Sequence, residues 1–315
     1  GEYQKALQCN YEALALSEEI GDRNGVATTL VNIGHIQAEL GEFDKAMEYY
    51  QRHVELNRDL GDSLSASIVI GSIGKIHEHR GEYDKAMECY QQKLAIRSRL
   101  DDPGGIATSL MSIAGLYLTM GKNSKALDYY QRVEVLHREI GNRREAAAAV
   151  GNIGRTYADM GRHDAALRSF AAAIDEHRAI GYKQGLMYWL LGSAESLERV
   201  VDLESTMPPW LHDCLPDINE VVWKQDALSR ARAFAEECIS IADALPNPEI
   251  AFAGRMLTGW IRHELRKMGV TSGDADEPHE IVRQMLDAGG AEDRRAELSY
   301  WLWKMEGDEE MRRHA

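Results

Sequence analysis

One unit of 40 residues recurs along the first two hundred residues of the chain. The segment "GEFDKAMEYYQRHVELNRDLGD" begins at Gly41, and "GEYDKAMECYQQKLAIRSRLDD" begins 40 residues later at Gly81. The same register returns at Gly1, Gly121 and Gly161. Units of this length fold by stacking on their neighbours, so the array needs no single central core. The length of 315 residues therefore does not by itself set the number of domains.

Each unit predicts two helices joined by a tight turn. After Gly81, large apolar residues follow at steps of three and four, at Tyr83, Met87, Tyr90 and Leu94, as on one face of an amphipathic helix. The second half of the unit has the same periodicity. A Gly-Asp or Gly-Asn pair usually separates the halves, because Gly accepts the left-handed conformation past a helix end and Asp or Asn caps the next helix.

Small residues recur in two fixed registers of the unit. One register holds Gly34, Gly74, Ala114, Gly154 and Ala194; the other holds Ala6, Ala46, Ala86, Ala126 and Ala166. A glycine inside a helix costs about 1 kcal/mol relative to alanine. Its recurrence therefore predicts that the two helices of a pair approach closely at these positions.

The unit resembles the tetratricopeptide repeat (TPR). In the fourth full copy the matching residues are Val150, Gly154, Tyr157, Ala166 and Phe170. The 40-residue length is similar to the repeats of kinesin light chains and of Leu-Gly-Asn-type adaptors. The resemblance covers residues 1 to about 203. It implies an all-α fold, a right-handed α-α superhelix that forms a solenoid of antiparallel helix pairs.

Four positions depart from the repeat pattern. Gln37 and His77 stand where an aromatic residue is usual, and His53 and Lys93 stand where a small residue is usual. We expect altered packing at these positions within an unchanged fold.

Composition divides the chain into three parts. Residues 1–203 form the regular array, 204–220 a proline-rich loop insertion, and 221–315 degenerate TPR-like helical repeats. In the last part we expect helices at 225–245, 248–269, 279–290 and 291–305. The chain begins on the second helix of a repeat and ends on what looks like the start of another second helix. We therefore expect the chain to be part of a longer protein.

Charge and cysteine content bear on partners and compartment. The formal net charge is −15, which disfavours binding to a phosphate backbone. No apolar run is long enough to span a membrane. The four cysteines include no C-x-x-C pair, and the repeat places Cys9 two units away from Cys89, too far for a disulfide. We expect a cytoplasmic protein with no membrane or nucleic-acid partner.

Fragments that suggest catalysis lack the residues that catalysis needs. "HELRK" at 263–267 and "HEIVR" at 279–283 begin like the zincin motif but have no second histidine, and "GSIGK" at 71–75 has the wrong spacing for a phosphate-binding loop. We therefore predict no enzyme activity, no cofactor and no metal site.

The resemblance also implies where a ligand lies, because in this family the first helix of each pair lines the inner wall on which peptides bind. The peptide-binding candidates in that register are Thr28, Asn32, His35, Ser72, Lys75, His79, Met111, Ser112, Asn152, Arg155, Asp159, Tyr188 and Glu195. Glu39, Leu191 and Arg199 share the register.

The polar members of this register suit a peptide. Asn32, Ser72, Ser112 and Asn152 recur every 40 residues and either hydrogen-bond an extended peptide backbone or bond within their own repeat. Lys75 and Arg155 offer positive charge to a carboxylate.

These features predict a non-catalytic scaffold that binds a peptide or partner protein in the concave groove. The alternative is a regulatory or sensor segment of a larger bacterial signalling enzyme: an ATPase, a cyclase or a caspase-like peptidase. Two further hypotheses are self-association through an exposed repeat end and occupation of the groove by residues 205–216.

Overall fold

The computed structural model describes residues 2–204, 207–217, 219, 222–245 and 247–270. Within these ranges the chain is all-α, with thirteen helices and no strand. It divides into two compact units, which we call unit 1 (residues 1–142) and unit 2 (residues 143–315). The helices expected at 279–290 and 291–305 lie outside the described residues.

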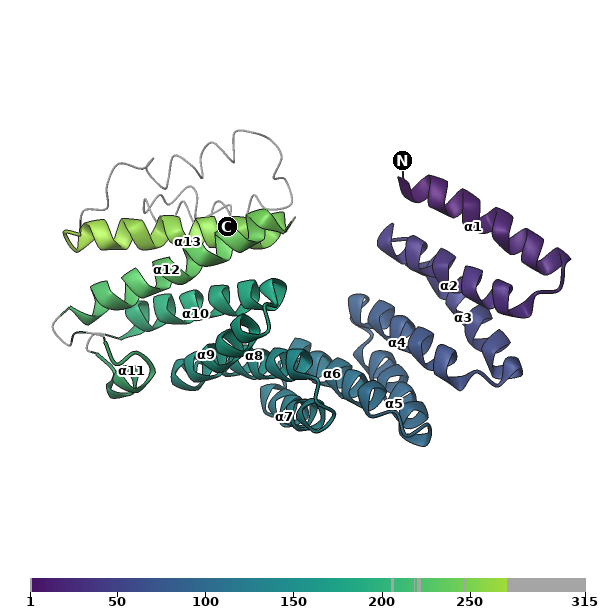
Figure 1. The fold of residues 1–315 in the computed structure, drawn as a ribbon, viewed down its shortest axis with the longest axis horizontal. Helices are drawn as coiled ribbons and strands as arrows, with labels where there is room; N and C mark the ends of the chain where they lie inside the picture. The colour runs from purple at the N-terminus through teal and green to yellow at the C-terminus, as the bar shows by residue number, and fades with distance from the viewer. Residues whose placement is uncertain (1, 205–206, 218, 220–221, 246, 271–315) are drawn as a thin grey trace. The chain divides into compact units, whose positions relative to one another are not determined.

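Unit 1 consists of seven helices that pack in chain order (Figure 1). They are α1 (Glu2–Glu19), α2 (Arg23–Glu39), α3 (Phe43–Leu60), α4 (Ser63–His79), α5 (Tyr83–Arg99), α6 (Pro103–Thr119) and α7 (Asn123–Glu139).

Unit 2 continues the same pattern and adds one short helix. Its helices are α8 (Arg143–Asp159), α9 (His163–Ala179), α10 (Lys183–Leu203), α11 (Pro209–Cys214), α12 (Trp223–Ala244) and α13 (Pro248–Lys267). Consecutive helices pack as pairs in both units, as the repeat pattern predicts.

The turns between helices use the predicted residues. Glycines from Gly21 to Gly181 that follow a helix have φ between +67° and +76°, a region that disfavours side chains with a Cβ. Asp22, Asp62 and Asp102 then cap the next helix by accepting the backbone N–H three residues on, at 3.0, 3.0 and 2.9 Å. At one turn Asp101 replaces glycine and adopts φ +49°.

The recurring glycine makes room for the aromatic residue of the next helix. A Cβ placed on Gly34 would lie 2.5 Å from the Tyr50 ring, and one on Gly74 would lie 2.6 Å from the Tyr90 ring. Both tyrosines are almost fully buried, and the alanine register, from Ala46 to Ala166, is completely buried. The prediction of close helix contact is confirmed.

The four unusual residues are accommodated locally. Gln37 is buried and donates through Nε2 to the hydroxyl of Tyr11 at 3.1 Å, while His53 is buried with its Nε2 at 3.0 Å from Nδ2 of Asn57. His77 Nδ1 lies 2.6 Å from a carboxylate oxygen of Glu82. Burial lowers the pKa of Lys93, whose alkyl chain fills the space beside a glycine, Gly71, on the preceding helix.

The proline-rich insertion is not wholly a loop. Pro209–Cys214 forms α11, because Pro208 and Pro209 stand before and at the first helical position, where a missing N–H costs nothing. Leu211 is fully buried, and the Cys214 thiol lies 3.7 Å from the carbonyl oxygen of Asp164 on α9. Helix α11 therefore packs on α9.

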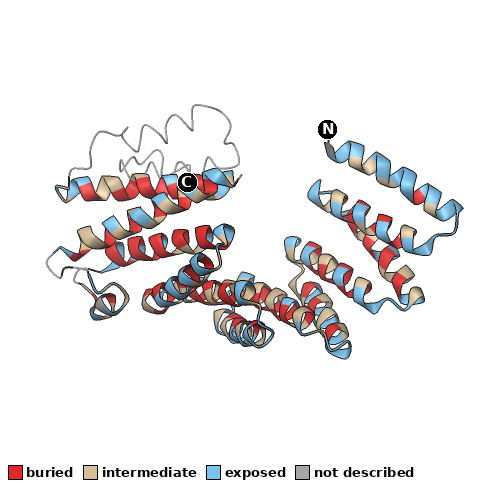
Figure 2. Ribbon diagram, viewed as in Figure 1, coloured by how far each residue is buried: buried red, intermediate tan, exposed pale blue. Residues whose placement is uncertain are grey.

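Beyond the insertion, α12 packs against both α10 and α13. The largest apolar core of the described chain lies in unit 2 and includes Met187, Leu228 and Trp260, so that α10 and α13 have long buried faces (Figure 2). The helices expected at 225–245 and 248–269 are thus present, as α12 and α13. No helix in the described ranges has the length and apolarity that crossing a membrane requires.

Candidate functional site

The first hollow lies in unit 1, between α2 and α4 and over α3, and has a volume of about 520 Å³. Its walls are His35, Ala38, Glu39, Phe43, Tyr50, Ser72, Lys75, Ile76 and His79.

Aromatic rings form much of the first hollow. Tyr50 is 2% exposed, and burial raises its pKa to about 12 against the opposing effect of the nearby Ser72. The His35 ring meets the Tyr50 ring edge-on at 5.5 Å, and the His79 ring stacks on Phe43 at 5.7 Å. These contacts fix both imidazoles against the helices.

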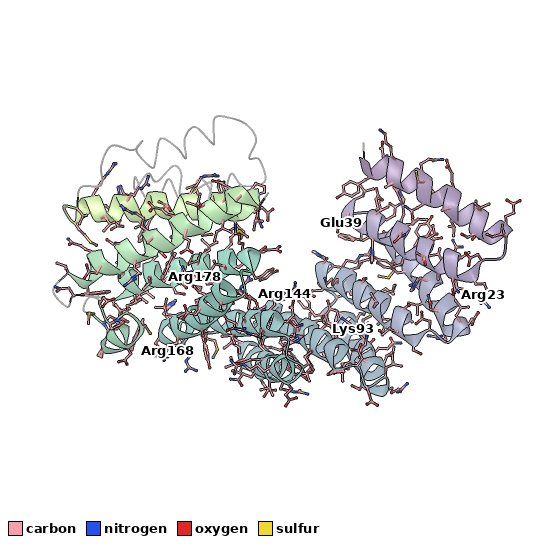
Figure 3. All side chains as sticks on the ribbon, viewed as in Figure 1. Arg23, Glu39, Lys93, Arg144, Arg168 and Arg178 are labelled. Carbon is pink, nitrogen blue, oxygen red and sulfur yellow. The ribbon has the colours of Figure 1, made fainter. Side chains whose placement is uncertain are left out.

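The first hollow also carries opposite charges. Glu39 comes from the end of α2 and Lys75 from α4, and both side chains are exposed (Figure 3 labels Glu39). Burial lowers the pKa of His35, and the nearby Lys75 lowers it further against the opposing effect of Glu39. A neutral His35 can both donate and accept hydrogen bonds.

The second hollow lies in unit 2 and has a volume of about 350 Å³. Helices α8 and α10 supply most of its wall, with single residues from α9 and α13. The lining residues are Arg155, Ala158, Asp159, Phe170, Tyr188, Trp189, Leu191, Gly192, Glu195, Ser196, Arg199 and Ile250.

The Trp189 indole forms an apolar wall of the second hollow and is held from three sides. It stacks on Phe170 with ring centres 6.2 Å apart, and its Nε1 donates to Nδ1 of His177 at 3.1 Å. A Cβ on Gly151 would overlap the indole, so glycine is required there. Burial lowers the pKa of His177, which favours the neutral ring that this bond needs.

The second hollow contains arginines without carboxylate partners. Elsewhere in unit 2, Arg143 pairs with Glu176 at 2.6 Å and Arg178 pairs with Glu237 at 2.5 Å. Arg155 and Arg199 are exposed and form no ion pair among the residues that the structure describes. Asp159 is likewise exposed and forms no ion pair in that part of the chain.

Eight of the residues predicted from the sequence line the two hollows. His35, Ser72, Lys75 and His79 line the first, and Arg155, Asp159, Tyr188 and Glu195 line the second. Their binding role stays a prediction.

The other five predicted residues, Thr28, Asn32, Met111, Ser112 and Asn152, line neither hollow. The Thr28 hydroxyl donates to the carbonyl of Asn24, and the Ser112 hydroxyl to that of Thr108, both at 3.0 Å. For Ser112 the structure has the alternative that the sequence left open, a bond within its own repeat.

Sequence reasoning missed the aromatic and aliphatic walls. Phe43, Tyr50, Phe170, Trp189 and Ile250 line the hollows, yet none is in the inner register of a first helix. For Tyr50 and Phe170 the sequence did hold a signal. The recurring glycine of the preceding helix, Gly34 or Gly154, lies against each of these rings.

Two hypotheses from the sequence can be compared with the described residues. No described residue of 205–216 lines either hollow, since α11 packs on α9 beside Arg168 (Figure 3). In the described ranges, no group of three or more His, Cys, Asp or Glu side chains is placed to hold a metal ion.

The chain belongs to the tetratricopeptide-repeat family. The family model, described as "Tetratricopeptide repeat", matches residues 1–59, 65–134 and 106–179, together more than half of the chain. No curated protein sequence matches the chain.

Solved structures share this fold at low sequence identity. A Signal Transduction ATPase with Numerous Domains (STAND) protein with a tetratricopeptide repeat sensor, from Pyrococcus horikoshii, aligns with a TM-score of 0.66 at 12% identity. The alignment covers 96% of this chain but only 42% of that one. The apo form of RapI aligns with a TM-score of 0.62 at 13% identity, over 91% of this chain and 98% of that one.

A kinesin-light-chain protein is also among the similar structures. The putative kinesin light chain repeats of Podosopora anserina align with a TM-score of 0.50 at 13% identity, over 69% of this chain and 96% of that one. These likenesses agree with the fold expected from the sequence and extend to the fold alone.

Proposed function

We propose that the chain is a non-catalytic interaction scaffold that binds an extended peptide segment of a partner protein. One observation carries the proposal: in each unit, inner-register side chains from two successive first helices meet at one hollow with an aromatic wall. Hollows of 350 and 520 Å³ hold one or a few side chains, so they suit a peptide better than a folded surface.

Repetition explains how modest sites give useful affinity. An extended peptide presents its side chains and backbone groups at regular intervals, and a repeat array presents its hollows at regular intervals along the chain. Each contact contributes little alone, and the contacts together must exceed the entropy lost when the peptide is ordered.

Filling the hollows tests the proposal. Ala38→Trp and Ala158→Trp place a bulky ring in the first and second hollow, whereas Ala95→Trp and Ala171→Trp add the same ring at exposed positions of α5 and α9. The ligand probe is a soluble library of random 12-residue peptides, with retained peptides read by mass spectrometry.

We expect the unmodified chain and the two exposed variants to retain the same peptides, and the hollow-filling variants to lose them. Thermal unfolding of each variant checks that it is folded. Equal retention by the filled variants, or no retained peptide on the unmodified chain, contradicts peptide binding in the hollows.

A second candidate is a sensor segment of a larger signalling enzyme. The observation that favours it is the alignment of nearly this whole chain with 42% of a STAND protein that contains a tetratricopeptide repeat sensor. Reading the complete gene decides it: a nucleotide-binding, cyclase or peptidase domain in the same reading frame supports this candidate, and a frame without one contradicts it.

A further inference from the structure

A buried histidine lies behind the aromatic wall of the second hollow. Trp189 of α10 lines the hollow, and the imidazole of His177 on α9 accepts a hydrogen bond from its indole Nε1 at 3.1 Å. His177 is completely buried and is not among the residues that line the hollow. A change in this ring therefore reaches a ligand only through the indole.

The hydrogen bond requires a neutral imidazole. Nδ1 of His177 needs its lone pair to accept from the indole, and Nε2, which lies 3.3 Å from the carbonyl oxygen of Arg144, carries the proton. The indole nitrogen is a donor only. A proton added to Nδ1 therefore places two N–H groups against each other, and the contact changes from attraction to repulsion.

Of the two rings, the indole has the freer path. A Cβ on Gly185 would overlap the imidazole of His177, whose ring also meets that of Tyr182 edge-on at 5.1 Å, so the imidazole is enclosed. The indole of Trp189 lies against Gly151 on one side, but it is only half-buried and borders the hollow. Repulsion between the rings therefore moves the indole toward the hollow.

Carboxylates from three helices lie around this end of α9, and each pairs with an arginine (Figure 3 labels Arg144 and Arg178). The pairs are Glu145 with Arg144 on α8, Glu176 of α9 with Arg143 of α8, and Glu237 of α12 with Arg178 of α9, at 2.8, 2.6 and 2.5 Å. Helix α11 contacts α9 nearer its other end, at Asp164.

Burial outweighs these carboxylates at His177. It lowers the pKa of the ring below 6.5, against the opposing effects of Glu145 and Glu176. The ring is therefore neutral at pH 7.5 and gains its proton as the pH falls below about 6.5.

We propose that His177 makes peptide binding in the second hollow depend on pH: a proton on its Nδ1 displaces the Trp189 indole and weakens the contact with an apolar side chain of the peptide. The proposal rests on the proposed function and adds its regulation. A peptide bound at neutral pH is released as the solution becomes acidic.

The first test needs no ligand. In the ¹⁵N-labelled chain, the indole N–H resonance of Trp189 is the one that Trp189→Phe removes. We expect this resonance to shift between pH 7.5 and 5.5, and to stay in place in His177→Gln, whose amide accepts a hydrogen bond without titrating. His163→Gln, which replaces another buried histidine of α9, is the matched control and should keep the shift. Far-UV circular dichroism checks that each protein stays folded.

The control histidine is a demanding one. Burial lowers the pKa of His163, and Arg199, which lines the second hollow, lowers it further. If titration near the hollow were enough to change binding, His163→Gln would alter the pH response as well.

The second test measures binding. The probe is the histidine-free peptide that the unmodified chain retains best from the random 12-residue library at pH 7.5 and that Ala158→Trp loses. We expect its dissociation constant to rise at least about threefold from pH 7.5 to 5.5, as the loss of one modest contact implies, for the unmodified chain and His163→Gln. His177→Gln should bind it equally at both pH values. Trp189→Phe has no N–H to oppose the proton, so its binding should also be independent of pH.

The outcomes separate the two proposals. If the indole resonance of the folded chain does not shift, or His177→Gln and Trp189→Phe keep the pH dependence of the unmodified chain, the role of His177 is overturned and the scaffold stands. If no peptide is retained at pH 7.5, or none is lost in Ala158→Trp, peptide binding in this hollow is overturned and its regulation with it.

Discussion

Trp189 and His177 are joined by a hydrogen bond from the indole Nε1 to the imidazole Nδ1, 3.1 Å long. The other ring nitrogen, Nε2, lies 3.3 Å from the carbonyl oxygen of Arg144, so the neutral ring with its proton on Nε2 satisfies both contacts. His177 is completely buried. A protonated ring would direct a second N–H at the indole N–H, so this pair couples the wall of the second hollow to pH.

The first prediction concerns stability against pH. The folded chain holds the pKa values of His177, His35, His53 and His163 below 6.5, mainly by burial. The unfolded chain therefore binds protons more readily. The stability gained from neutral rings is complete above about pH 6.5. It is lost as the pH falls toward the pKa values that these histidines have in the folded chain. Urea unfolding between pH 7.5 and 5.5 should show a decreasing free energy of unfolding.

His177→Gln isolates one contribution to this pH dependence. The amide keeps a hydrogen-bond acceptor but does not titrate, so the variant should be less sensitive to pH between 7.5 and 5.5 than the unmodified chain. His79→Gln, which replaces an exposed ring, serves as the control. An unchanged pH slope in His177→Gln would show that the buried ring is not the titrating group.

The second prediction concerns the glycine that faces an aromatic ring. In a free helix Gly34→Ala would stabilise by about 1 kcal/mol, but the new Cβ would lie 2.5 Å from the Tyr50 ring, and overpacking costs about 1–3 kcal/mol. We expect a net loss of about 1 kcal/mol in urea unfolding. In a chain that carries Tyr50→Leu, Gly34→Ala should lower the free energy of unfolding by less than it does in the unmodified chain. A stabilised Gly34→Ala protein would contradict the steric explanation.

Much of the fold was predictable because its signals are local. The turn glycines, the capping residues, the prolines at helix starts and the steps of three and four residues are all local signals. They locate helices such as α13 to within two residues of the predicted range 248–269. The short helix α11 was missed, because prolines mark both loops and helix starts.

The site was only partly predictable, because register fixes the face of a helix but not the distance across to its neighbour. Thr28 and Lys75 share the inner register, yet only Lys75 reaches a hollow. Trp189 has no counterpart at 149, 109, 69 or 29, where the chain has Ala, Ser, Val and Thr, so comparing repeats does not reveal it.

The third prediction concerns the repeat turn in which Asp101 stands in place of glycine. Asp101 adopts φ +49°, which costs a residue with a Cβ about 1–2 kcal/mol, partly offset by the larger freedom of glycine in the unfolded chain. We expect Asp101→Gly to raise the free energy of unfolding by about 0.5 kcal/mol. Gly141→Ala, at φ +74° in the equivalent turn, should lower it by about 1 kcal/mol. Denaturant unfolding that ranks the two changes in the opposite order would refute the account.

The fourth prediction separates a helix cap from an ion pair by using two copies of the repeat. Asp22 and Asp102 occupy equivalent positions and accept the N–H of Gly25 and Gly105 at 3.0 and 2.9 Å. Only Asp102 also pairs with an arginine, Arg97, at 2.5 Å, and that guanidinium is largely buried. Asp22→Ala should therefore lose the cap alone, about 1 kcal/mol.

Asp102→Ala should lose the cap and also leave the buried Arg97 charge without its partner. The second effect adds about 2 kcal/mol, typical of a hydrogen bond to a charged group. The double variant Asp102→Ala/Arg97→Met should recover most of this addition, because an apolar side chain of similar length then fills the same space without a charge. Equal losses for Asp22→Ala and Asp102→Ala, measured by urea unfolding at pH 7, would mean that the Arg97 pair does not stabilise the fold.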